Sequence, residues 1–225
     1  MKDVFEKIYK TNAWRGETPS GVGSNLANAY GVISGLGKFF HQHDINTLID
    51  APCGVYHWMR VLMKEHTEIL RYIGFDLVDA IIAQNKANNP EPYISFAQGD
   101  ISQPLPPFAL PEASKTLVIT RDCFIHLPYA TIFKTLKNLL TLPGDYYAFG
   151  SYPDFTNIDC AVGGYRPLNM RLAPFNFPEP LVQIKESDAL TEDGRLFPLK
   201  MLYVYGRENL EQSLKKLADI KYRLP

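Results

Sequence analysis

The chain has 225 residues and a formal net charge of −1, with 46% hydrophobic and 21% charged residues. This is the composition of an ordinary globular protein, without the basic excess of a nucleic-acid binder. No run of about 18 uncharged apolar residues predicts a membrane segment. The three cysteines (Cys53, Cys123 and Cys160) are far apart and odd in number, which indicates neither a disulfide framework nor a zinc cluster. We therefore expect a cytoplasmic protein.

Helical periodicity predicts helices over residues 3–12 and from Leu26 to Phe40. Further along the chain, short apolar runs typical of buried strands alternate with helical patterns. The runs cover residues 45–51, 69–75, 93–97, 116–120 and 146–152. Such alternation predicts an α/β fold, with a parallel sheet, right-handed crossovers and helices on both faces.

The alternation stops after residue 152. The next segment is rich in Pro, Asn and aromatic residues and is too long for an ordinary connection, so we expect a lid or binding loop. Two β-rich runs at 181–187 and 200–206, around a TEDG turn, predict an antiparallel hairpin at the sheet edge. Residues 207–220 are predicted to form a final helix. We expect one domain, with an N-terminal helical cap, a cofactor-binding core, a lid-like substrate segment and an edge hairpin with terminal helix (1–44, 45–151, 152–180 and 181–225).

Polar residues follow the predicted strands at the ends where ligands bind in open α/β sheets. They are Asp50, Asp76, Asp100 and the pair Arg121–Asp122. Gly54 permits close approach of the backbone to a ligand, and Asp76 lies 22 residues further on. This is the place where an acid binds ribose hydroxyls in dinucleotide folds.

The phosphate-binding signature of those folds is missing. The residues after Gly54 are Val, Tyr, His, Trp and Met, so the GxGxxG pattern fails, and there is no GxxxxGK[ST]. The failed pattern counts against a nicotinamide oxidoreductase, which remains an alternative. A nucleoside ligand without phosphate fits better.

Four motifs occur in order along the chain: TNAWRGETPSGVGS, IDAPCG, TRDCFIHL and YRPLNMRLAPFNFP. Together they resemble a poorly characterised bacterial-type subgroup of the class I S-adenosylmethionine-dependent methyltransferases, over roughly residues 9–205. The resemblance implies a Rossmann-like methyltransferase fold, with a mostly parallel twisted sheet of about seven strands and an antiparallel edge hairpin. It also implies S-adenosylmethionine as cofactor and methyl transfer as the reaction. The lid-like segment, with its aromatic residues and Arg166, indicates a small-molecule acceptor.

The resemblance implies a role for each matching residue. The methionine end of the cofactor is lined by Asp50, Ala51, Pro52, Cys53 and Gly54. Asp76 holds the ribose and Leu77 lies beside the adenine, while Asp100 and Ile101 meet the adenine amine and ring. Arg121 and Asp122 lie beside the sulfonium. The subgroup usually reads CGDFNW where this chain reads CGVYHW, so Val55 and His57 replace an acid and an amide.

The residue types suggest further candidates, each with a plainer alternative. Ser20, Gly21 and Ser24 could bind the cofactor carboxylate or form an ordinary loop. Trp14, Phe175 and Phe177 could stack on a ligand or pack in the core. Asp122 and His126 are candidate general bases, or a helix cap and a packing residue. Arg166 could clamp an acceptor carboxylate or anchor its loop.

No metal site is predicted, because His41 and His43 are two apart and do not share a helix face. The departures at Val55 and His57 motivate a second hypothesis, a catalytically impaired S-adenosylmethionine-binding regulatory or partner protein. The sequence indicates neither the acceptor nor the oligomeric state.

Overall fold

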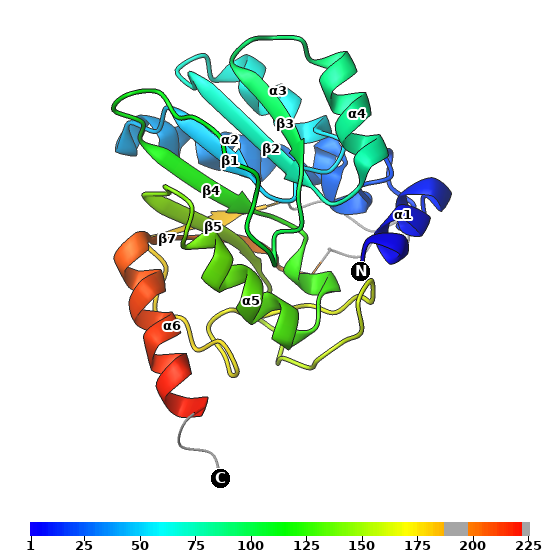
Figure 1. The fold of residues 1–225 in the computed structure, drawn as a ribbon. Coiled ribbons are helices and arrows are strands. Elements are labelled where there is room, and N and C mark those ends of the chain that lie inside the picture. The colour runs from blue at the N-terminus through cyan, green and yellow to red at the C-terminus, as the bar shows by residue number, and fades with distance from the viewer. Residues whose placement is uncertain (187–197, 222–225) are drawn as a thin grey trace.

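The structure is a computed structural model that describes residues 1–186 and 198–221 (Figure 1). Within these residues one sheet has the strand order β3-β2-β1-β4-β5-β7-β6. The strands are β1 (Thr47–Asp50), β2 (Arg71–Asp76), β3 (Ile94–Gln98), β4 (Thr116–Thr120), β5 (Tyr146–Ser151), β6 (Val182–Lys185) and β7 (Met201–Gly206). The first five are parallel, whereas β7 runs antiparallel to both β5 and β6. The predicted mostly parallel sheet with an antiparallel edge pair is confirmed.

The two faces of the sheet are covered by different layers. Successive residues of a strand point to opposite faces, so Leu48 packs into one core and its neighbour Ile49 into the other. The first layer contains helices α2 (Leu26–His43), α3 (His57–Glu65) and α4 (Asp79–Asn88), and the second contains α5 (Tyr129–Leu139) and α6 (Arg207–Lys221). None of the helices in the described residues is long and apolar enough to cross a bilayer.

In the edge hairpin, the spatial order of the strands differs from their order in the sequence. Its second strand, β7, lies between β5 and β6, so that β6 forms the edge of the sheet. The predicted TEDG turn lies outside the described residues.

Much of the segment 152–180 packs against the sheet. It contains no helix or strand between β5 and β6, and it packs on the face of the sheet that also carries α5. Four of its apolar side chains are core residues, at most 3% exposed: Leu168, Met170, Phe175 and Phe177. Phe175 contacts the rings of Tyr129 and Phe133, and Phe177 contacts Phe149. These four apolar groups are used in packing, whereas Tyr165 of the same segment is 61% exposed. Closure of the segment over a ligand stays a prediction.

Candidate active site

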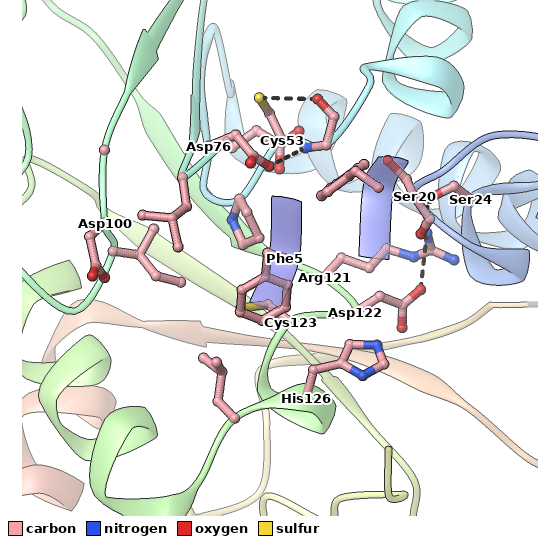
Figure 2. Close-up of a pocket in the computed structure, with 18 of the residues that line it drawn as sticks. Phe5, Ser20, Ser24, Cys53, Asp76, Asp100, Arg121, Asp122, Cys123 and His126 are labelled. Atoms are coloured by element: carbon pink, nitrogen blue, oxygen red, sulfur yellow. Dashed lines mark hydrogen bonds and ion pairs between the residues drawn. The ribbon is translucent and has the colours of Figure 1, made fainter. Parts of the chain in front are cut away.

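A cavity of about 820 Å³, including its open mouth, lies at the carboxyl ends of β1, β2 and β4 (Figure 2). Asp50 is the last residue of β1, Asp76 is the last residue of β2, and Arg121 follows β4 directly. Because neighbouring parallel strands end at the same edge, these residues of different segments meet around one space. The cavity also borders six residues for which the resemblance implies cofactor contacts: Pro52, Cys53, Gly54, Leu77, Asp100 and Ile101.

Asp76 is buried and organises the turn after β1. Its Oδ2 accepts a hydrogen bond from the Gly54 amide at 3.0 Å, and its Oδ1 accepts one from the Val78 amide at 3.0 Å. Gly54 has a φ of +52°, and a Cβ there would collide with Ser20 Oγ. Ser20 Oγ in turn accepts a hydrogen bond from the Val55 amide at 3.0 Å. The turn thus requires glycine, and it links the N-terminal segment to the strand ends.

Burial raises the pKa values of two cavity carboxyls. Burial raises the pKa of Asp50 to about 7, although a hydrogen bond from the Tyr72 hydroxyl at 2.8 Å opposes the shift. Burial likewise raises the pKa of Asp76 to about 6, against hydrogen bonds from backbone amides that favour its ionised form. A positively charged ligand would favour ionisation of both groups.

The far wall of the cavity is formed by the loop after β3. Asp100 accepts hydrogen bonds from the Ser102 amide at 2.9 Å and from the Ser102 hydroxyl at 2.7 Å. These bonds fix the loop, and the buried Ile101 lines the same wall. Figure 2 shows Asp100 at the side of the cavity opposite Ser20.

Helix α1 (Lys2–Thr11) lies over the carboxyl ends of the strands (Figure 1). Met1, Phe5 and Tyr9 are four residues apart and line the cavity together with Trp14. Lys2 anchors the helix through an ion pair with Asp79 at 2.6 Å. Sequence analysis assigned no site role to these residues of α1, although their spacing on one helix face was visible. The cavity is therefore covered by the N-terminal segment and not by residues 152–180.

A second cavity, about 1090 Å³ including its open mouth, adjoins the first. The two share Trp14, Ser20, Arg121, Asp122 and His126 as lining residues. Gly21, Tyr152 and Tyr165 also border the second cavity, whereas Ala51 is buried behind the first. The residues at the junction are those where a group could pass from a ligand in one cavity to a ligand in the other.

Four charged side chains form a cluster at this junction. Arg121 donates to Glu186 Oε2 from Nε at 2.9 Å and from Nη2 at 2.6 Å, and Lys200 Nζ lies 2.8 Å from the same oxygen. Lys200 also forms an ion pair with Asp122. Glu186 directly follows β6 and Lys200 directly precedes β7. Neither was identified from the sequence, because nothing local marks them as partners of Arg121.

Asp122 is held ionised at the junction. Burial raises its pKa, but the Lys200 ammonium and the Arg121 guanidinium outweigh that effect and hold the pKa at about 2. Asp122 has a φ of +53°, and Gly23 makes room for its carboxylate, since a Cβ at Gly23 would collide with Oδ2. A carboxylate with so low a pKa is a poor proton acceptor but a good electrostatic partner for a cation.

His126, in contrast to the charged Asp122, lies in surroundings that favour its uncharged form. Its Nδ1 lies 2.6 Å from the Gly164 carbonyl oxygen, and its ring stacks on Trp14 at a centroid distance of 4.4 Å. Burial lowers its pKa, although the hydrogen bond to Gly164 opposes the shift. Burial therefore favours the neutral ring, in which Nδ1–H donates a hydrogen bond to the Gly164 carbonyl oxygen and Nε2 carries the lone pair.

Arg166 is not brought to either cavity. It is 2% exposed, and its guanidinium donates hydrogen bonds to the carbonyl oxygens of Ile158, Phe124 and Leu127. It joins the segment after β5 to the turn before α5, which supports the loop-anchoring alternative for this arginine. Its partners are backbone carbonyl oxygens and not the carboxylate of an ion pair. Neither cavity is lined by Val55 or His57, the two departures from the subgroup pattern.

No known family model matches the chain, and no curated protein matches its sequence. The fold is that of class I S-adenosylmethionine-dependent methyltransferases. An S-adenosylmethionine-dependent methyltransferase from Leishmania major has a TM-score of 0.62 and 18% identity, covering 89% of this chain and 82% of its own. An S-adenosylmethionine-dependent methyltransferase from Anabaena variabilis has a TM-score of 0.57 and 16% identity, and the match covers 90% of this chain and 93% of that protein. Magnesium protoporphyrin IX methyltransferase from Synechocystis, with bound S-adenosylmethionine, has a TM-score of 0.53 and 13% identity, covering 79% and 78%.

Proposed function

We propose that this chain binds S-adenosylmethionine in the main cavity and transfers its methyl group to a small molecule in the adjoining cavity. The observation that carries the proposal is the junction itself, where His126 and Asp122 border both cavities. The fold of the structural neighbours supports the same assignment, as do the acids that end β1 and β2 and the acid that follows β3.

The charges of the main cavity fit this cofactor. Its charged side chains are four carboxylates and one arginine, and Arg121 is already paired with Glu186. A pyrophosphate would meet repulsion there, whereas a sulfonium and an ammonium group would be attracted. Nicotinamide dinucleotides are therefore disfavoured. Asp76 at the end of β2 would hold the ribose, Asp100 after β3 would hold the adenine, and Asp50 would hold the methionine end.

S-adenosylmethionine, when bound, supplies an electrophilic methyl group on a positively charged sulfur. Asp122 would stabilise charge at the junction, and α1 would exclude water from the cavity. An acceptor hydroxyl or amine must lose a proton as its new bond to carbon forms. His126 lines both cavities and its Nε2 carries a lone pair, so we propose it as the base and expect an acceptor with an O–H or N–H group.

Two measurements test the proposal. Calorimetry should detect S-adenosylmethionine or S-adenosylhomocysteine binding with micromolar affinity, about −8 kcal/mol, and no comparable binding of NAD. A metabolite extract supplied with labelled S-adenosylmethionine should yield a methylated small molecule. Binding without any methyl incorporation would favour the regulatory alternative, and absence of binding would contradict the proposal.

His126→Gln then tests the base. We expect turnover of the identified acceptor to fall by roughly 10²–10⁴-fold, because the lone pair that accepts the proton is lost. Affinity for S-adenosylmethionine should hardly change. His57→Gln is the matched control, since His57 lines neither cavity. Equal turnover in both variants would remove His126 from the chemistry.

A further inference from the structure

Three side chains of metal-ligand type meet at the opposite end of the sheet from the two cavities. His41 lies in the last turn of α2, His66 directly follows α3, and Glu68 lies in the loop before β2. These segments precede the amino ends of β1 and β2, whereas the cavities lie at the carboxyl ends. One nitrogen of each histidine and one carboxylate oxygen of Glu68 all lie within 4.8 Å of one another.

The distances match those around a single metal ion. Two ligand atoms bound to tetrahedral zinc at about 2.0–2.1 Å are separated by about 3.3 Å. His66 Nδ1 lies 3.1 Å from Glu68 Oε1, and His41 Nε2 lies 3.7 Å from the same oxygen. Two imidazoles and a carboxylate form a ligand set that zinc uses, with water at the fourth position. We infer that His41, His66 and Glu68 bind a divalent transition metal, with zinc as the best-fitting ion.

Two of the three ligands are already held in place. The His66 ring lies against Gly37, where a Cβ would collide with it, and it makes an edge contact with the Phe40 ring at 5.6 Å. The side chain of Glu68 is 31% exposed, and its Oε1 lies 3.1 Å from His66 Nδ1. His41 is 74% exposed, so its ring can rotate to complete the site. A hydrogen bond joins His66 and Glu68, and the rings of His41 and His66 meet edge-on at a centroid distance of 6.4 Å.

His43, the other histidine of this helix end, is directed elsewhere. Its Nδ1 lies 3.2 Å from the Tyr146 hydroxyl, and its ring packs on Phe39 at 4.4 Å. It therefore serves as the control histidine for the site.

A metal at this site would cross-link α2 to the loop between α3 and β2, two parts of the same helical layer. Because it is remote from the junction, its role is to stabilise the fold and not to take part in chemistry. At a zinc concentration about 100 times Kd, the Tm should rise by roughly 5–10 °C. Zinc should leave S-adenosylmethionine affinity unchanged, so the metal site and the proposed function are tested independently.

The experiment titrates metal-free full-length protein with zinc chloride by calorimetry and repeats the thermal melt. We expect one equivalent to bind, and expect His41→Ala and Glu68→Gln each to weaken binding by more than roughly tenfold and to abolish the rise in Tm. His43→Gln should bind zinc like the wild type. Melts without metal establish that the variants are folded, since the two changed side chains are at the surface. Absence of saturable binding, or wild-type affinity in both variants, would overturn the assignment.

Discussion

Replacing Asp76 by alanine separates the ligand-binding role of this carboxylate from its structural role. Two backbone amides, of Gly54 and Val78, lose their acceptor, which costs about 1–3 kcal/mol each. The opposing effect is relief from a buried carboxylate whose pKa is raised to about 6. The shift from the ordinary value of 3.8 is worth about 3 kcal/mol at pH 8. We therefore expect the free energy of unfolding to change by less than about 3 kcal/mol.

The affinity for S-adenosylhomocysteine should fall in the Asp76→Ala protein. If Asp76 accepts hydrogen bonds from the ribose, Asp76→Ala loses a buried charged acceptor, which costs about 1.5–3 kcal/mol. The dissociation constant of S-adenosylhomocysteine should then rise roughly 10- to 150-fold, measured by calorimetry at pH 8. Glu91→Ala is the control, since it removes an exposed acid beside the amino end of β3. An unchanged dissociation constant in a folded Asp76→Ala protein would refute the placement of the ribose.

Two further predictions concern buried charges. Arg166→Met should lower the free energy of unfolding by about 3–6 kcal/mol in urea titration, because three carbonyl oxygens lose their donor. Cofactor affinity should be unchanged, and a loss of turnover without loss of stability would instead return Arg166 to acceptor binding. Because burial raises the pKa of Asp50 to about 7, its protonated form favours the folded state. This contribution is complete below pH 4 and is lost as the pH rises through 7, so the ligand-free protein should lose about 1.4 kcal/mol of stability from Asp50 between pH 6 and 8. Asp50→Asn should remove most of that slope, and a slope as steep as the wild type's would contradict it.

The sequence by itself determined the alternation of strands and helices and the position of the acids that follow the strands. Buried parallel strands appear as short apolar runs, and their carboxyl ends must share one edge, so the residue pattern alone placed Asp50, Asp76 and Asp122 together. The edge hairpin was predictable for a similar reason, since β-rich runs beside a turn pair locally.

Only the tertiary structure decided which distant segments complete the two sites. The sequence marked Arg166 as a candidate ligand, but a guanidinium forms strong hydrogen bonds equally well with a substrate and with backbone carbonyls, and packing selected the carbonyls. Phe5 covers the cavity because α1 docks across the strand ends, and Lys200 reaches Asp122 because β7 lies beside β5. In the same way, His41 meets His66 only because two helices of one layer end side by side. Each of these contacts joins residues far apart in the chain, and local residue patterns carry no information about which surfaces the folded chain brings together.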